Sequence, residues 1–136
     1  MRALVMALAA VVLGVATAWG QSRGGDGPWC SRDAACQVDT ATFVGWRVFE
    51  THCAGCHGQS GVGSRFAPEL GSRMRGMTQR EFSVALREGY RGLQGRMTPR
   101  ADNRDVARYV DELWSYLRAR ASGDLGPGPL ERFSEN

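Results

Sequence analysis

The sequence contains no lysine, and all 17 of its basic residues are arginine. This absence removes the side-chain amine from the candidate metal ligands. Histidine is also scarce, since His52 and His57 are the only two. When Arg2 of the N-terminal leader is set aside, 16 arginines stand against 14 acidic residues. The resulting net charge of +2 is too small to indicate a nucleic-acid-binding protein.

A hydrophobic run long enough to span a bilayer is missing as well. The longest apolar run comprises the 16 residues 3–18, whereas a membrane-spanning helix needs about 20 apolar residues. The stretch follows Arg2 and ends in the small residues Ala-Thr-Ala, which is the pattern of a secretory signal peptide. We therefore predict a signal peptide over residues 1–20, cleaved after Ala18 or Gly20, and a periplasmic protein. We expect no stable membrane insertion after the signal is removed.

Export changes how the four cysteines are interpreted, because structural disulfides persist outside the cytoplasm. Cys30 and Cys36 enclose a short loop, CSRDAAC, and we predict that they form a disulfide. They have neither a CxxC spacing nor further ligands close by, so a thiol switch or a metal site is not favoured. The disulfide would tie an extended leader over residues 21–38.

Helical periodicity dominates the rest of the chain, and no alternation is strong enough to build a sheet. We predict helices over residues 40–52, 78–89 and 103–120. Thr78 and Glu81 have the spacing of a capping box, and Gly89 suits a helix C-terminus.

Between and after these helices the sequence is rich in glycine and proline. Residues 58–77 and 90–100 are expected to form irregular loops. The predicted organisation is an all-α domain over residues 39–121 that is followed by a Gly/Pro-rich tail over residues 122–136.

The sequence CAGCH places Cys53, Cys56 and His57 within five positions. A structural zinc site would need a second pair of ligands, and none is spaced to match. A thioredoxin-like site would need an α/β fold around the motif, which the periodicity does not predict. The third interpretation is a covalent haem c, with thioethers from both cysteines and His57 as the proximal iron ligand. The sequence favours this haem.

The remaining ligands follow by elimination. His52 is too close in sequence to reach the opposite haem face, and Met74 and Met77 are better explained as core residues. Met97 lies 40 residues after His57 in a loop between two predicted helices, so we predict it as the distal iron ligand. The backbone carbonyl of Pro68 is the expected acceptor for the other ring nitrogen of His57.

Arginine is concentrated between Arg65 and Arg108, a segment that contains ten arginines and only five acidic residues. This excess could steer an acidic partner protein, and it could equally be a solvated surface. The loop that carries Arg91, Arg96 and Arg100 is the candidate docking face.

These motifs resemble the small class I cytochromes c. GWRVF is similar to the Gly-x-x-x-aromatic face of their first helix, CAGCH to their haem motif, and YVDELWSYL to their last helix. The resemblance implies three or more helices wrapped around one haem, and it implies that Leu70 of APEL forms part of the haem wall. The family usually places proline directly after the ligand methionine, whereas here Thr98 intervenes between Met97 and Pro99.

A narrower likeness, over about residues 36–130, is to periplasmic cytochromes c associated with quinoprotein (PQQ-dependent) alcohol and methanol dehydrogenases. It implies a non-enzymatic carrier of single electrons, with such a dehydrogenase as donor and a terminal oxidase or another cytochrome as acceptor. Two alternatives stay open. One is a carrier in an unrelated respiratory chain, and the other is a peroxidase or gas-binding protein with an open sixth iron position.

Overall fold

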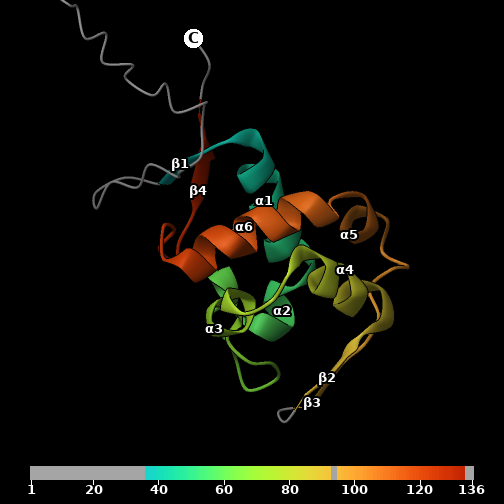
Figure 1. Cartoon of the computed structure of the whole chain (residues 1–136). Helices are drawn as coiled ribbons and strands as arrows, with labels where there is room; N and C mark the ends of the chain where they lie inside the picture. The colour runs from blue at the N-terminus through green and yellow to red at the C-terminus, as the bar shows by residue number, and fades with distance from the viewer. Residues whose placement is uncertain (1–35, 93–94, 134–136) are drawn as a thin grey trace, which may run out of the picture.

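A computed structural model describes residues 36–92 and 95–133 of the chain (Figure 1). The predicted signal peptide, most of the leader and Cys30 lie outside these residues. The elements in chain order are β1 (Cys36–Val38), α1 (Thr40–His52), α2 (Ala54–His57), the 3-10 turn η1 (Gln59–Gly61), α3 (Leu70–Arg75), α4 (Gln79–Glu88), β2 (Tyr90–Gly92), β3 (Gly95–Met97), α5 (Arg104–Arg108), α6 (Val110–Ser122) and β4 (Leu130–Arg132). None of the helices in the described ranges is both long and apolar enough to cross a membrane.

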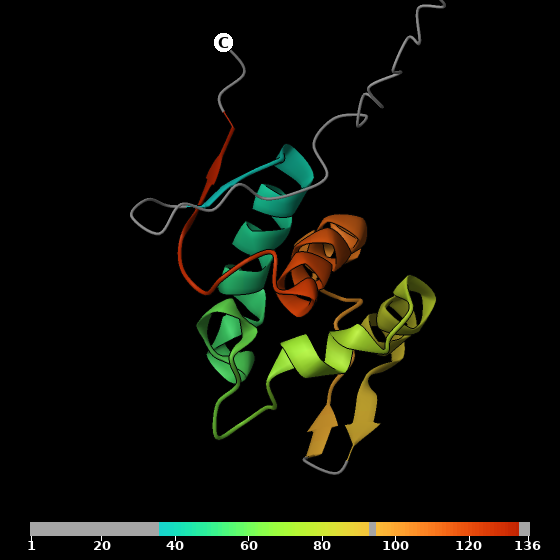
Figure 2. The same ribbon diagram turned by 60° about the vertical axis from the view of Figure 1, so that its left-hand side comes forward.

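Helices α1 and α6 cross in direct backbone contact and form the centre of the fold (Figures 1 and 2). The crossing depends on Gly45, because a Cβ atom there would lie 1.9 Å from the carbonyl oxygen of Glu112. One turn further along α1, the ring of Phe49 packs on that of Tyr116 with centroids 5.5 Å apart. The predicted first helix, 40–52, is confirmed.

Every α-helix of the described chain except α2 contributes buried apolar side chains to the core around this crossing. Its buried apolar side chains are Val38, Val48, Phe49, Met74, Phe82, Leu86, Val106, Leu113, Tyr116, Leu117, Ala121, Leu125 and Leu130. Such a core is expected for helices that each present one apolar stripe.

Helix α4 begins and ends as its sequence predicts. The Thr78 hydroxyl accepts from the backbone N–H of Glu81, and the Glu81 carboxylate accepts from the backbone N–H of Thr78, which completes a capping box. At the other end Gly89 has a φ of 83°, a value that glycine adopts without strain.

The predicted terminal helix, 103–120, is interrupted in the structure. Asn103 caps α5 by accepting from the N–H groups of Asp105 and Val106. Tyr109 then leaves the helical region, with φ −112° and ψ 36°, so that α6 starts afresh at Val110. The apolar spacing continues through the break, and periodicity therefore could not detect it.

Two loop expectations are corrected. The stretch 58–77 contains α3, whose first turn is capped by the Glu69 carboxylate accepting from the N–H of Ser72. The stretch 90–100 contains an antiparallel hairpin in which Tyr90 pairs with Met97 and Arg91 with Arg96. Elements of three to six residues are too short to show a periodic pattern.

The segment after α6 returns to the start of the described chain. Strand β4 pairs in parallel with β1, with Cys36 opposite Leu130. The two-stranded pairs β1–β4 and β2–β3 lie at opposite ends of the molecule in both views (Figures 1 and 2).

Ser60 ties this returning segment to the helices. Its hydroxyl accepts from the N–H of Gly128, its carbonyl accepts from Arg120 Nε, and its own N–H donates to the Glu50 carboxylate. Ser60 is buried and has a positive φ of 55°, an uncommon conformation for a residue other than glycine. Three partners therefore hold this turn in place beside the CAGCH motif.

Candidate functional site

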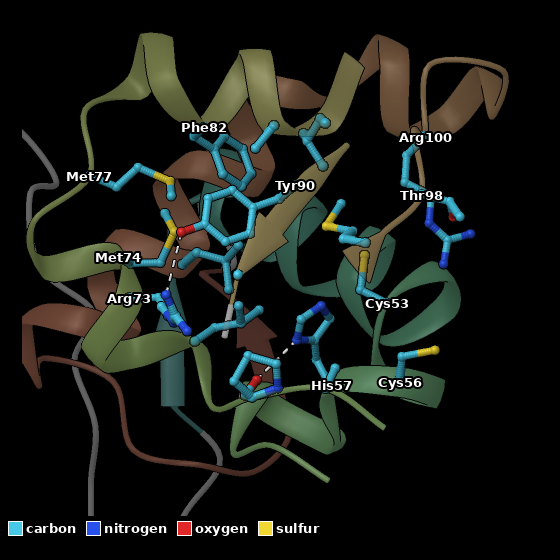
Figure 3. Close-up of a pocket in the computed structure, with 18 of the residues that line it drawn as sticks. Cys53, Cys56, His57, Arg73, Met74, Met77, Phe82, Tyr90, Thr98 and Arg100 are labelled. Atoms are coloured by element: carbon cyan, nitrogen blue, oxygen red, sulfur yellow. Dashed lines mark hydrogen bonds between the residues drawn. The ribbon is translucent and has the colours of Figure 1, made fainter. Parts of the chain in front are cut away.

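The CAGCH motif forms a tight turn at the end of α1. Cys53 ends the helix with its N–H donating to the Phe49 carbonyl, and its own carbonyl accepts from the N–H groups of Cys56 and His57 at 3.1 and 2.9 Å. Gly58 follows with φ 73°, which turns the chain away. The turn brings Cys53, Cys56 and His57 to the wall of one cavity (Figure 3).

The orientation of the His57 ring is fixed by a hydrogen bond to the backbone of a neighbouring loop. Its Nδ1 lies 3.0 Å from the carbonyl oxygen of Pro68, which is the contact expected from the sequence. Because a carbonyl can only accept, Nδ1 carries the proton and Nε2 keeps its lone pair available for a metal.

The loop that carries Pro68 is fastened to the motif. The N–H of Gly63 donates to the His57 carbonyl at 2.7 Å, and the Ser64 hydroxyl donates to the Cys56 carbonyl. Gly63 has φ 90°, and a Cβ atom there would lie 2.8 Å from the Glu69 nitrogen. The acceptor for His57 is thus built into a loop with little freedom to move.

The cavity is lined mainly by apolar side chains from several elements. Besides the motif it is bounded by Phe49, Phe66, Ala67, Pro68, Leu70, Arg73, Met74, Met77, Phe82, Ala85, Leu86, Tyr90, Gly92, Gly95, Arg96, Met97, Thr98, Arg100, Leu113 and Leu117. Pro68 and Leu70, both expected at the site, are among them. Burial in these surroundings raises the pKa of the Cys53 thiol to about 11, with Arg100 acting in the opposite direction.

Met97 ends β3 and lines the cavity half-buried. Its backbone is held against the end of α4, since a Cβ atom at Gly89 would lie 2.6 Å from the Met97 carbonyl oxygen. Met74 and Met77 also line the cavity, and Met74 is 2% exposed within the core. In Figure 3 these two methionines lie at the end of the cavity away from Cys53 and Cys56.

His52 takes no part in the cavity wall. Its ring nitrogens lie 3.2 Å from Asn103 Nδ2 and 3.3 Å from Asp105 Oδ2, so it links the end of α1 to the start of α5. No group of three or more His, Cys, Asp or Glu side chains among residues 36–92 and 95–133 could hold a bare metal ion. The zinc alternative therefore has no support in that part of the chain.

The donors that line this cavity fit a haem. Two thiols on one turn suit thioether attachment, a fixed imidazole offers Nε2 as an iron ligand, and an apolar wall excludes water. Residues 41–117 match the family model described as cytochrome C oxidase, cbb3-type, subunit III. The chain belongs to the cytochrome c family.

Individual relatives agree with this assignment. Cytochrome c-555 of Methylococcus capsulatus is 30% identical over 96 residues, which cover 70% of this chain and 75% of the relative. Cytochrome c-553I of Paracoccus denitrificans is 35% identical over 100 residues, and the match spans 44% of its length. The crystal structure of the c-type cytochrome XoxG from Methylobacterium extorquens AM1 is 30% identical, with a TM-score of 0.66, and the match covers 84% of this chain and 77% of that one.

Family membership establishes three of the expectations drawn from the sequence. The cytochrome has a class I-like helical fold, its cofactor is a covalent haem c, and it is an electron carrier rather than an enzyme. It therefore exchanges electrons with redox partner proteins.

The sequence did not single out Arg73 and Tyr90. Both line the cavity, and Arg73 Nη1 lies 3.4 Å from the Tyr90 hydroxyl. Arg73 belongs to α3 and Tyr90 to β2, two elements that were expected to be irregular loop. The signal that could have found Arg73 is its position five residues after Pro68, on the same cavity-lining segment.

Proposed function

We propose that this cytochrome is periplasmic and carries electrons from a quinoprotein alcohol dehydrogenase to a terminal oxidase or another cytochrome. The observation that carries the proposal is the set of donors on one cavity: two thiols, an imidazole fixed by Pro68, and the thioether of Met97. Cys53 and Cys56 would form the thioether links to the haem, His57 Nε2 would serve as the proximal iron ligand, and Met97 would serve as the distal ligand. Bound haem supplies a single-electron couple.

The protein would influence the haem redox couple through a fixed imidazole, an apolar wall and two iron ligands. Pro68 holds the imidazole through Nδ1, which makes His57 a stronger donor and fixes its ring. Leu70, Leu86 and Leu113 line the cavity and keep water away from the metal. Ligation by both His57 and Met97 would raise the reduction potential and would leave no open position for a substrate.

The dehydrogenase as donor is supported by the likeness of residues 36–130 to cytochromes of quinoprotein alcohol oxidation. The periplasmic location is supported by the signal-peptide pattern of residues 1–20.

The docking face that we propose is the β2–β3 hairpin with Arg91 and Arg96, together with Arg100. The hairpin arginines are exposed and stand opposite each other, which is unfavourable for like charges unless an acidic group approaches. Arg100 acts electrostatically on the Cys53 thiol and so lies near the thioether edge of the site. An acidic patch on the donor would complement this face in a small, transient interface.

Rapid mixing provides the test. The oxidised cytochrome is combined with a substrate-reduced quinoprotein alcohol dehydrogenase, and haem reduction is followed by absorbance. Fast reduction that slows as salt is raised supports the proposal, because charge steering is screened by ions. Reduction no faster than that of an unrelated c-type cytochrome, at low salt as well as high, would reject the dehydrogenase as donor while leaving the carrier role intact.

A further inference from the structure

The cavity carries positive charge without compensating negative charge. Three arginines, Arg73, Arg96 and Arg100, are part of its wall, and no Asp or Glu of the described residues lines it. No ion pair between described residues joins any of the three arginines to a carboxylate. A buried or half-buried guanidinium normally acquires an anionic partner, because desolvation without one is unfavourable.

The three arginines occupy different parts of the cavity. Arg100 lies near Cys53 and therefore near the thioether edge. Arg96 is exposed on β3. Arg73 is half-buried and lies at the other end of the cavity, where Figure 3 shows it beside Met74 and Tyr90 and well separated from Cys53 and Cys56.

Arg73 and Tyr90 present converging hydrogen-bond donors. Arg73 Nη1 is 3.4 Å from the Tyr90 hydroxyl oxygen, and the guanidinium carbon is 5.9 Å from the ring centroid. Gly92 permits this approach, because a Cβ atom there would lie 2.9 Å from the Tyr90 ring and 3.7 Å from Arg73 Nη2. The Tyr90 hydroxyl accepts from Arg73 and keeps its own O–H to donate, as do the remaining N–H groups of Arg73.

We propose that Arg73 and Tyr90 bind a propionate carboxylate of the haem. The two propionates of haem leave the macrocycle from the side opposite the vinyl groups that form the thioethers. With the thioethers at Cys53 and Cys56, a propionate is directed to the end of the cavity that holds Arg73 and Tyr90. A guanidinium and a phenol together match a carboxylate with charge-assisted hydrogen bonds.

The pair has a consequence for the electron carrier. The positive charge of Arg73 disfavours the oxidised haem, which bears one more positive charge than the reduced haem, and so raises the reduction potential. Arg73 also stabilises the ionised propionate and lowers the pH range in which the potential depends on propionate protonation. The inference rests on haem attachment at Cys53 and Cys56, and it is independent of the donor dehydrogenase.

The test uses Arg73→Gln and Tyr90→Phe in the full-length holo-protein, with Arg75→Gln as matched control. Arg75 is exposed on the same helix and does not line the cavity, so its removal changes the net charge equally. Redox titrations over a range of pH give the potential of each protein and the pH window in which it varies. A pyridine haemochrome spectrum first establishes that each variant carries covalent haem, which separates failure of the attachment from failure of the inference.

We expect Arg73→Gln to lower the potential and to move the pH window upward by about one unit or more. Tyr90→Phe should shift both in the same direction by less, and Arg75→Gln should match the unchanged protein. Equal behaviour of Arg73→Gln and Arg75→Gln would overturn the inference. If Arg73→Gln cannot be produced with covalent haem, the Tyr90→Phe variant provides the test. An unchanged reduction potential and an unchanged pH window in Tyr90→Phe would then overturn the inference.

Discussion

Gly45 of α1 and Glu112 of α6 are in backbone contact, because a Cβ atom at position 45 would lie 1.9 Å from the Glu112 carbonyl oxygen. The overlap involves main-chain atoms, which cannot rotate aside as a flexible side chain can. The crossing of the two helices that frame the haem cavity therefore requires glycine at this position.

Gly45→Ala should destabilise the holo-protein by about 1–3 kcal/mol, because the helices must separate to admit the methyl group. Denaturant unfolding of the oxidised protein measures this loss. Gly76→Ala is the matched control, since nothing lies within 4 Å of a Cβ atom at Gly76. Equal stability of the two variants would contradict the backbone contact.

Met97→Ala should abolish the charge-transfer band of a thioether bound to ferric haem and lower the reduction potential, because the distal ligand is lost. Absorption spectroscopy and redox titration check both effects. Met77→Ala, which also removes a cavity-lining methionine, should retain the band. Loss of the band in Met77→Ala with retention in Met97→Ala would reassign the ligand.

The pKa of the Glu69 carboxyl lies below the ordinary value of a glutamate, mainly because of the hydrogen bond from the Ser72 hydroxyl and then because of the backbone N–H of Ser72. A carboxyl group whose pKa is depressed by folding stabilises the protein above its unfolded pKa, and this contribution is lost as pH falls through the folded value. Glu69→Gln should therefore be less stable than the unchanged protein at neutral pH, and the difference should shrink below pH 4.5. Urea unfolding at several pH values measures the difference, and a gap that stays constant into the acid range would contradict the assignment.

The mature protein should contain no reactive thiol. Cys53 and Cys56 are expected as thioethers and Cys30 and Cys36 as a disulfide, although Cys30 lies outside the described residues. Thiol titration of the unfolded protein should detect none before reduction, and two after it, in agreement with a cleavable disulfide and permanent thioethers. Four thiols after reduction would show that haem is not covalently attached.

Arg91→Gln and Arg96→Gln should each slow reduction by the dehydrogenase severalfold at low salt and have little effect at high salt. Arg132→Gln is the control, because Arg132 is an exposed arginine on β4 at the far end of the molecule. Stopped-flow reduction rates provide the measurement. An equal slowing by all three substitutions would indicate net charge rather than a docking face.

The sequence predicted features that depend on local chemistry. The Thr78–Glu81 capping box, the helix over 40–52 and the Pro68 contact of His57 follow from short-range patterns, and the structure contains each of them. It did not predict α3 or the β2–β3 hairpin, since these elements are fixed by caps, pairing and a glycine rather than by periodicity. Arg73 and Tyr90 were missed for the same reason: they are 17 positions apart and meet only through those two elements.

The parallel pairing of β1 with β4 also determines where a surface, an electrode or a second protein can be attached to this carrier. Both ends of the described chain leave the molecule at the β1–β4 side, whereas the hairpin lies at the opposite side (Figures 1 and 2). A tether, an electrode linker or a fused oxidoreductase joined at either end would leave the proposed docking face of Arg91, Arg96 and Arg100 on the side away from the attachment. We therefore expect that immobilisation at this side would preserve contact with diffusing partners.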